Sequence, residues 1–527
     1  MKTYMIPVIL LMQTMAYAQE PAGNPWTMNP DPNAKITFQN PVIPGFYSDP
    51  SICRVGEDYY LVTSTFEFFP GVPVFHSKDL IHWEQIGHVM HRREQVPRGI
   101  NIFAPTLRYH RGVFYMITTN IAGGGNFYVT AKNPTGPWSD PVFVEVQGID
   151  PDLYFDEDGK TYVISSSFVL SQIDLETGKL IGEQRKVWNG TGGRYPEGPH
   201  IYKKDGYYYL MAAEGGTEEA HQETIARSNS IWGPYTENPA NPILAHANAA
   251  GQGNPIQGVG HADMIQAHDG SWWMVFHGYR SVTGYPAHHI LGRETCLAPV
   301  SWPTSGWPVV NGNGVVQVNM TCPTLPQKPF SPGEERIDFD KPLGLEWNYL
   351  QPPVETNYQV GLRQLILNGV AGRIGEAGSP TFVGRRLTDV AFTATTRLEF
   401  SPTQESEEAG IILLNNGTHF DLMVVRQKKK RYVIVKLQFG QTHYQSKPVM
   451  LEDGPVDLRI SGQGPTFSFA FAQGNETFRV VDRVDARFLS TETLGWFTGV
   501  YVGLYATGNG ELSKAPANFD WFQYAGN

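Results

Sequence analysis

The chain has few cysteines, fewer basic than acidic residues, and no long apolar run beyond its N-terminus. Three widely separated thiols, Cys53, Cys296 and Cys322, exclude a disulfide framework and allow one bridge at most, so buried free thiols are expected. No Cys-x-x-Cys pair indicates a zinc site. Lys and Arg number 40 against 51 Asp and Glu, and the formal charge of -11 argues against nucleic acid as a partner. No internal segment approaches the roughly 20 apolar residues that span a membrane.

The N-terminus is the exception to this shortage of apolar runs. It begins Met1-Lys-Thr-Tyr-Met, continues as an apolar run to Met15, and ends in Ala16-Tyr17-Ala18. A basic start, a short apolar core and an Ala-x-Ala site predict a secretory signal peptide over residues 1–18, followed by a leader over residues 19–35. No cysteine follows the cleavage point, which argues against a lipid anchor. We therefore expect an exported, soluble protein, periplasmic or alternatively extracellular, without membrane insertion.

Helical periodicity is scarce along the whole chain. Short aromatic and β-branched runs alternate with turns, and the content of 55 glycines and 39 prolines suits such turns. A chain of 527 residues exceeds one ordinary domain. The pattern therefore predicts an all-β protein with more than one domain.

Five similar segments occur between residues 49 and 278, at intervals of about 50 residues. Each has a small or acidic residue, usually followed by Pro, then an apolar stretch, a turn and an aromatic strand. This period is typical of propeller blades, and five copies predict a five-bladed β-propeller over residues 36–322. The copies begin at Asp49, Ala104, Asp150, Gly198 and His261.

A proline-rich segment, residues 323–335, interrupts this pattern and predicts a linker, because its four prolines cannot lie in central strands. Alternating strands follow it at residues 393–400, 432–437 and 467–471. They predict a β-sandwich of the jelly-roll, lectin-like type over residues 336–527. The basic run 426–431 lies between two such strands and is expected to form an exposed hairpin turn.

The repeat also predicts that distant residues meet, because blades place their first strands around one axis. Three carboxylates, Asp49, Asp150 and Glu197, and the imidazole of His261 should therefore face one mouth. Hydrolysis of a glycosidic bond needs one carboxylic acid that protonates the leaving oxygen and one carboxylate that attacks or activates water. The constellation thus favours a glycoside hydrolase. Ala104, at the start of the second copy, is uncharged and would leave room for substrate.

Two of these carboxylates differ in their local sequence. Asp49, between aromatic rings and Pro50, suits a base at the floor of a pocket, although Asp-Pro is also a common turn. Glu197 lies one position before the aligned start of its segment. There the neighbouring Tyr195 would raise its pKa, as a general acid requires; the alternative is a plain loop glutamate.

The third carboxylate has a competitor two residues away. Asp150 aligns with Asp49 in the repeat, whereas Asp152 falls within the strand, so Asp150 is preferred. Its charge would help to keep Glu197 protonated, because a like charge nearby raises a carboxyl pKa. His261 would be a metal ligand, a hydrogen-bond partner in the channel, or a structural histidine.

Five motifs in the propeller and two in the C-terminal half resemble signatures of glycoside hydrolase family 43. They are Gly45-Phe-Tyr-Ser-Asp-Pro50, Ile149-Asp-Pro151, Glu197-Gly-Pro-His200, Gly260-His-Ala-Asp263, Leu291-Gly-Arg-Glu-Thr295, Gly495-Trp-Phe-Thr-Gly499 and Asn518-Phe-Asp-Trp-Phe522. The last two are similar to the sandwich appended to xylosidase-type members. The resemblance implies an exo-acting, inverting enzyme that removes a terminal pentose from neutral oligosaccharides or hemicellulose.

The resemblance also implies a role for each matching residue. Asp49 would be the general base, Glu197 the general acid, and Asp150 the residue that orients the acid and tunes its pKa. Contacts to the substrate are expected from Arg293, Phe46 and Phe497, with Trp496 as the alternative to Phe497.

The cofactor and the sugar are less closely defined. In some members a channel histidine that matches His261 lies near a calcium ion, so the resemblance implies no required cofactor but leaves a structural calcium ion open. An α-L-arabinofuranosidase is favoured, with a β-D-xylosidase or a bifunctional enzyme as the alternative. A non-catalytic carbohydrate-binding propeller is the alternative of a different class, and the three convergent carboxylates argue against it.

Overall fold

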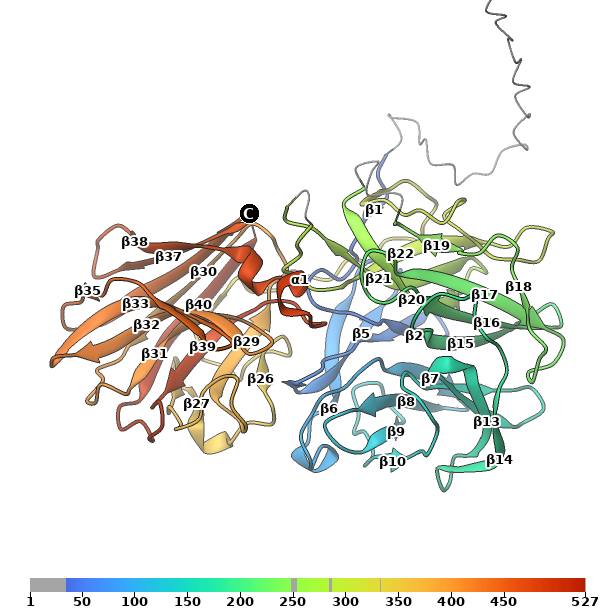
Figure 1. Ribbon diagram of the computed structural model, residues 1–527, viewed down its shortest axis with the longest axis horizontal. Helices are drawn as coiled ribbons and strands as arrows, with labels where there is room; N and C mark the ends of the chain where they lie inside the picture. The colour runs from blue at the N-terminus through green and yellow to red at the C-terminus, as the bar shows by residue number, and fades with distance from the viewer. Residues whose placement is uncertain (1–34, 248–253, 284–286, 332, 527) are drawn as a thin grey trace, which may run out of the picture.

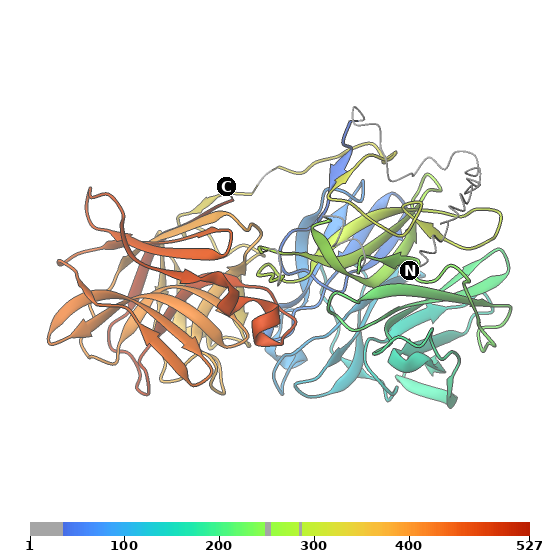
Figure 2. The same ribbon diagram turned by 45° about the horizontal axis from the view of Figure 1, so that its top comes forward.

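The structure is a computed structural model that describes residues 35–247, 254–283, 287–331 and 333–526. Two all-β domains lie side by side along its longest axis (Figure 1), and a stretch of chain runs from one to the other across the top of the view in Figure 2. The signal peptide expected over residues 1–18, and all of the leader except Lys35, lie outside the described residues.

The first domain is a five-bladed β-propeller, as the repeat predicts. Each blade is an antiparallel sheet whose strands follow one another in chain order, and the fourth blade has an additional strand. The blades are, in order, β2 (Ser51–Val55), β3 (Asp58–Val62), β5 (Gly71–Ser77) and β6 (Glu84–Met90); β7 (Thr106–His110), β8 (Val113–Asn120), β9 (Gly125–Ala131) and β10 (Val142–Phe143); β11 (Asp152–Phe155), β12 (Thr161–Ser165), β13 (Val169–Asp174) and β14 (Lys179–Lys186); β15 (Glu197–Lys204), β16 (Tyr207–Glu214), β17 (Gln222–Ser228), β18 (Thr236–Glu237) and β19 (Leu244–Ala245); and β20 (Ile256–Gln266), β21 (Trp272–Arg280), β22 (Glu294–Ser301) and β23 (Val309–Val310). The first strands surround the channel, so the residues that precede them gather at one mouth.

The two ends of the propeller chain are joined by backbone and side-chain hydrogen bonds. Strand β1 (Phe38–Gln39) pairs with β24 (Asn319–Met320). The Asn40 side chain then bonds both backbone groups of Leu297, with the Asn40 amide donating to the carbonyl at 3.0 Å and the Leu297 N–H donating back at 2.8 Å. These contacts hold the segment that leads into the first blade against the last one.

The second domain is a β-sandwich of two antiparallel sheets with an apolar core between them. In strand β36 (Val456–Gln463), buried and half-buried residues alternate, the pattern of a strand with one face in the core. One sheet has the order β27 (Tyr358–Gly361), β28 (Gln364–Leu367), β40 (Ala517–Gly526), β30 (Phe392–Glu399), β36 (Val456–Gln463), β37 (Thr466–Ala472) and β38 (Arg479–Asp485), with β25 (Arg336–Ile337) beside β40. The other has the order β34 (Thr442–Gln445), β33 (Lys430–Phe439), β32 (Thr418–Gln427), β31 (Glu408–Asn415), β39 (Tyr501–Thr507), β29 (Thr381–Arg386), β26 (Asn348–Leu350) and β4 (Phe68–Phe69), with β35 (Val449–Met450) beside β33.

Strand β4 belongs to the propeller sequence, so one sheet of the sandwich continues into the first domain. The junction is further fixed by Arg386, which is only 2% exposed. Its guanidinium donates to the Phe46 carbonyl at 2.6 Å and to the Asn348 side chain at 2.8 Å. The rings of Phe68 and Tyr501 stack with centroids 3.7 Å apart. A continuous sheet and a buried cation therefore hold the domains in one relative position.

Short helical turns complete the fold. Helix α1 (Thr491–Leu494) lies between the two domains in Figure 1 and leads into a loop that reaches the propeller. Single 3₁₀ turns occur at Arg93–Gln95, Ser166–Phe168, Glu355–Asn357 and Ala486–Leu489. Over the described ranges, no helix is long and apolar enough to cross a membrane.

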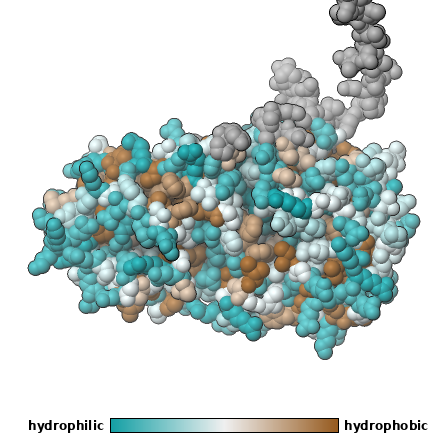
Figure 3. Space-filling model, viewed as in Figure 1, coloured by the Kyte–Doolittle hydropathy of each residue, from teal (hydrophilic) through white to brown (hydrophobic). Residues whose placement is uncertain are grey.

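The buried and exposed residues also agree with the composition. Cys53, Cys296 and Cys322 are all buried and free, as their spacing predicts. On the face shown in Figure 3, hydrophilic residues cover much of both domains, and apolar residues form separate patches, one of them near the middle of the view.

Candidate active site

A repeated backbone conformation places functional groups at the channel mouth. Asp49, Asp150 and His261 have φ angles of 56°, 52° and 49°, in the left-handed region that non-glycine residues rarely occupy. The equivalent residue of the fourth blade is Gly198, with a φ of 55°. Strained conformations of this kind concentrate at functional sites, where the surrounding structure fixes them. The offset of Glu197 in the repeat now has a structural cause, because the left-handed residue of its blade is the glycine that follows it.

Asp49 is a buried carboxylate with hydrogen bonds on both oxygens. Its Oδ1 accepts from Nη1 of Arg293 at 2.8 Å, and its Oδ2 accepts from the hydroxyls of Ser64 at 2.6 Å and Ser48 at 3.0 Å. Burial alone would raise the pKa of Asp49, but the charges of Arg293 and His261 outweigh it and hold the pKa well below its usual range. Asp49 is therefore ionised at neutral pH, the state that a general base requires.

The pocket above Asp49 has a volume of about 560 Å³ and is lined by both domains. Phe66 and Phe103 of the propeller and Phe497 of the sandwich form an aromatic wall. The ring centroids of Phe66 and Phe497 are 5.7 Å apart, and the Arg293 guanidinium carbon also lies 5.7 Å from the Phe497 ring. Ala104 lines the pocket as well, and its short side chain leaves space there.

The loop that carries Glu197 is fixed by a second, fully buried carboxylate. Glu214 accepts hydrogen bonds from the backbone N–H groups of Thr191 and Gly193, each at 2.7 Å. A Cβ added at Gly193 would lie 2.5 Å from Oε2 of Glu214, so only glycine permits this approach. The loop thus delivers Glu197 to the first position of β15 in a defined orientation.

Two histidines set the charge state of Glu197. Its Oε1 lies 3.3 Å from Nε2 of His221 and 3.9 Å from Nδ1 of His261. Burial favours the neutral acid, but the two nearby imidazoles outweigh it and hold the pKa of Glu197 below its ordinary value. The expectation that Tyr195 would raise this pKa is wrong, because Tyr195 is 69% exposed and provides no apolar enclosure.

Asp150 differs from Asp49 and Glu197 in that its pKa is raised. Burial raises the pKa of Asp150 to about 7, and the charges of Glu197 and Asp49 add to this effect. Burial disfavours a charged His261, but the two ionised carboxylates overcome it and raise the pKa of the imidazole to about 9. Near neutral pH, Asp150 is therefore partly protonated, and His261 is an imidazolium close to the carboxylates of Asp49 and Glu197.

The residues expected from the sequence are mostly together. Those that line the pocket are Asp49, Asp150, Glu197, His261, Arg293 and Phe497. Asp152, the competitor of Asp150, is instead bonded to Arg108 at 2.9 Å and does not line the pocket.

Phe46 is the expected substrate contact that the structure contradicts. Its side chain is fully buried, and its ring packs beneath Phe66 with centroids 5.8 Å apart. Phe66 therefore forms the pocket wall in its place. Of the two alternatives in the sandwich loop, Phe497 reaches the pocket, whereas Trp496 packs behind it against Phe66 at a centroid distance of 6.3 Å.

Several residues of the site were not predicted from the sequence, among them Phe66, His221 and His277. Phe66 lies in the run Phe66-Glu-Phe-Phe69, whose aromatic density was an available signal. His221 and His277 are isolated histidines with no motif, yet His277 Nδ1 lies 3.0 Å from Asp49 Oδ1 and its Nε2 lies 3.2 Å from His221 Nδ1. This pair of rings connects the surroundings of Asp49 with those of Glu197.

The channel beneath the pocket does not suit a calcium ion. Calcium takes about six to eight oxygen ligands. The channel carboxylates Asp152 and Asp263 already bind the guanidinium of Arg108, at 2.9 Å and 2.7 Å. The imidazole of His261 is engaged with carboxylates of the pocket: its Nδ1 lies 3.7 Å from Asp49 Oδ1 and 3.9 Å from Glu197 Oε1. Within the part of the chain that the structure describes, no group of three or more His, Cys, Asp or Glu side chains could hold a metal ion.

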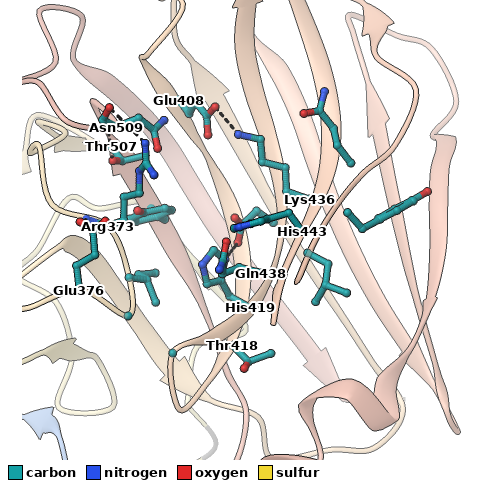
Figure 4. Close-up of a pocket in the computed structure, with 18 of the residues that line it drawn as sticks. Arg373, Glu376, Glu408, Thr418, His419, Lys436, Gln438, His443, Thr507 and Asn509 are labelled. Atoms are coloured by element: carbon teal, nitrogen blue, oxygen red, sulfur yellow. Dashed lines mark hydrogen bonds and ion pairs between the residues drawn. The ribbon is translucent and has the colours of Figure 1, made fainter. Parts of the chain in front are cut away.

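A second and larger concavity, of about 990 Å³, lies on the nine-stranded sheet of the sandwich (Figure 4). Its charged groups are engaged locally: Lys436 pairs with Glu408, and the Glu376 carboxylate accepts from the Arg373 N–H at 2.9 Å. The convergent acid–base groups lie in the smaller propeller pocket. The chemistry of the side chains, rather than the size of the cavity, therefore assigns the candidate active site.

Comparison with known families agrees with this architecture. The family model for glycosyl hydrolases family 43 matches residues 38–308, and that for the beta xylosidase C-terminal Concanavalin A-like domain matches residues 336–525. The chain belongs to glycosyl hydrolase family 43. It is therefore an enzyme that hydrolyses glycosidic bonds.

This family 43 enzyme resembles its relatives over nearly its whole length. It is 44% identical over 512 residues to the non-reducing end alpha-L-arabinofuranosidase BoGH43B of Bacteroides ovatus, covering 93% of this chain and 95% of the relative. It is 38% identical over 521 residues to a xylosidase/arabinosidase of Butyrivibrio fibrisolvens, covering 92% and 99%. Among solved structures, the Bacteroides ovatus xyloglucan PUL GH43B has a TM-score of 0.89 at 43% identity, covering 93% of this chain and 100% of that one. The xylan beta-1,4-xylosidase from Bacillus halodurans has a TM-score of 0.87 at 33% identity, covering 92% and 99%.

Proposed function

We propose that the enzyme is an exported, inverting exo-glycosidase that releases α-L-arabinofuranosyl residues from the non-reducing ends of hemicellulose side chains or oligosaccharides. The observation that carries the proposal is the pair Asp49 and Glu197, whose oxygens lie 3.7 Å and 3.9 Å from the same nitrogen of His261, at the mouth of one channel. One of them is a fixed carboxylate, and the other lies near enough to Asp150 for its charge to add to the effect of burial and raise the pKa of Asp150 further.

The proposed reaction is a single displacement. Asp49 removes a proton from a water molecule, and the water oxygen forms a bond to the anomeric carbon. Glu197 gives its proton to the glycosidic oxygen as the bond to the leaving sugar breaks, so the anomeric configuration inverts. Asp150 supports this step because it holds a proton next to Glu197 up to about pH 7. The hydrogen bonds from Arg293, Ser64 and Ser48 hold the Asp49 carboxylate ionised and in place, as activation of a water molecule requires.

The shape of the pocket supports action on a terminal sugar. The aromatic wall of Phe66, Phe103 and Phe497 encloses the space above Asp49, and the last of these rings comes from the other domain. A substrate that must enter such a pocket does so by its end, which favours exo-action. The uncharged rings suit a neutral sugar, since aromatic faces pack against apolar sugar faces.

The choice of sugar rests on the relatives. The Bacteroides ovatus relative at 44% identity is named a non-reducing end arabinofuranosidase, which supports arabinose. The Butyrivibrio fibrisolvens relative at 38% identity is named a xylosidase/arabinosidase, so β-D-xylosidase activity, alone or combined, is the second candidate.

The test is a side-by-side assay of nitrophenyl α-L-arabinofuranoside and nitrophenyl β-D-xyloside. We expect a higher kcat/KM on the arabinofuranoside for the wild type, and loss of most activity on both substrates in Asp49→Asn. Ser305→Ala, at an exposed turn residue that does not line the pocket, is the control that should retain wild-type rates. A preference for the xyloside would favour the second candidate, and wild-type turnover by a folded Asp49→Asn variant would exclude the proposed base.

Export is part of the proposal because of the signal sequence over residues 1–18. Expression of the full chain in a bacterium with a periplasm, followed by fractionation and N-terminal sequencing, checks this. The expected product starts at Gln19, whereas an uncleaved protein in the cytoplasm would contradict export.

A further inference from the structure

All five blades meet at the guanidinium of Arg108, in the channel beneath the pocket. Arg108 belongs to the second blade, and its Nη1 donates to Asp263 of the fifth blade at 2.7 Å, while Nη2 donates to Asp152 of the third at 2.9 Å. Nη2 also lies 3.0 Å from Nδ1 of His200 in the fourth blade. The first blade contributes Ser51, whose hydroxyl donates to the same oxygen of Asp263 at 2.7 Å. One side chain thus links the first strands of the whole ring.

These partners are in register with the site above. Each is two residues after the left-handed residue of its own blade, so a displacement of the partner is transmitted to the backbone of that residue through a single intervening residue. The pairs are Asp49 and Ser51, Asp150 and Asp152, Gly198 and His200, and His261 and Asp263. The layer around Arg108 is therefore the support on which the catalytic layer rests.

The charge balance of this layer depends on Arg108. The side chains of Asp152 and Asp263 are 1% and 0% exposed, and two buried carboxylates require a compensating cation. Burial would raise the pKa of Asp263, but the Arg108 charge outweighs it and holds the pKa below its ordinary value. Oδ1 of Asp152 has no hydrogen-bond partner among the described residues, so this carboxylate relies on the guanidinium and His200 at its other oxygen.

We propose that Arg108 is a positioning residue for catalysis: its guanidinium is the internal cation of the channel and stands where a metal ion would otherwise hold Asp152 and Asp263 together. It acts on Asp49 through Ser51 and on the segment of Glu197 and Gly198 through His200, while Asp152 and Asp263 support Asp150 and His261; it does not touch the substrate. The inference rests on the proposed function for the roles of base and acid. Its distinctive consequence is that the channel becomes a cation site once the guanidinium is removed.

The test compares Arg108→Ala with Arg54→Ala. Arg54 is an exposed residue of β2 that donates to the Gly56 carbonyl at 2.8 Å, so it controls for the loss of one arginine near the same strands. Calorimetric titration with calcium chloride, in the absence of substrate, should detect binding to Arg108→Ala but not to the wild type or Arg54→Ala. The kcat of Arg108→Ala should fall about tenfold or more, with little change in KM, as for other residues that orient catalytic groups. Millimolar calcium or guanidinium should restore part of that kcat, and a chelator should leave the wild type unchanged.

Several results would overturn the proposal. One is wild-type kcat in Arg108→Ala; another is a folded Arg108→Ala variant that binds no calcium and that neither cation restores. Loss of wild-type activity on chelation, reversed by calcium, is a third. If Arg108→Ala does not fold, the proposal is tested on Arg108→Lys instead. The single ammonium group of lysine cannot reproduce the geometry with which the guanidinium binds Asp152 and Asp263 through two different nitrogens. Stimulation of the kcat of Arg108→Lys by calcium supports the proposal, and wild-type kinetics without a calcium effect overturn it.

The calorimetry separates this inference from the proposed function. It uses no substrate, so calcium binding by Arg108→Ala can be established even if the wild type cleaves neither pentoside. An inactive wild type would count against the proposed function alone.

Discussion

Replacement of Glu197 by Gln should reduce hydrolysis by an amount that depends on the leaving group. The amide keeps the size of the side chain and an acceptor oxygen for His221 and His261, which lie 3.3 Å and 3.9 Å from Oε1, but it has no proton to transfer. A general acid contributes about a hundredfold to ten-thousandfold to the rate. On an arabinose-containing oligosaccharide, whose sugar leaving group must be protonated, we expect kcat to fall about a thousandfold, which corresponds to about 4 kcal/mol in the barrier.

The assay compares that oligosaccharide with a dinitrophenyl α-L-arabinofuranoside. A dinitrophenolate leaves without a proton, so the loss on this substrate should stay below about tenfold. Glu237→Gln, an exposed carboxylate on β18 of the same blade, is the matched control and should keep wild-type rates on both. Equal losses on the two substrates, with the fold intact by circular dichroism, would refute the assignment of Glu197 as the acid.

Three further predictions concern the surroundings of the acid and base. Gly198→Ala should lower kcat severalfold more than Gly206→Ala, because an added Cβ would lie 2.8 Å from His261 Nε2 at the first position, whereas nothing lies within 4 Å at the second. Both glycines have positive φ, so each alanine should cost about 1 kcal/mol of unfolding free energy, and equal kcat in the two variants would contradict the contact. Asp150→Asn should move the alkaline limb of the pH profile of kcat/KM to lower pH. The pKa of Asp150 is raised to about 7, so Asp150 keeps a proton in the cluster below that pH. The remaining acid, Glu197, has a pKa below its ordinary value. A pH–rate profile whose alkaline limb stays in place would count against a contribution of the Asp150 proton. Phe497→Ala should raise KM about tenfold with little change in kcat, because its ring lines the pocket without carrying a proton, and initial-rate kinetics in which kcat falls instead would refute this.

The fold could be predicted from the sequence because its units repeat. Alignment of the five segments places Asp49, Asp150 and His261 at equivalent positions, and in the structure all three share a left-handed backbone conformation. The alternation of apolar residues likewise predicted the sandwich strands, and the basic run 426–431 does form the hairpin between β32 and β33. Periodic features of this kind are local, so a single sequence contains them.

The features that could not be predicted depend on contacts between distant segments. Phe46 and Phe66 are both aromatic residues close to Asp49, and only the junction with the sandwich decides that the first is buried and the second lines the pocket. The charge of Glu197 is set by His221, which belongs to no motif. Arg108 gave no signal because its partners come from four other blades.

The stereochemistry of the first-formed product tests the central mechanism most directly. Proton NMR of the wild-type reaction with an α-L-arabinofuranoside, recorded before the free sugar mutarotates, distinguishes the two anomers. Water activated by Asp49 and a leaving oxygen protonated by Glu197 predict that the β-anomer appears first. Initial release of the α-anomer would contradict a single displacement and require a covalent intermediate instead.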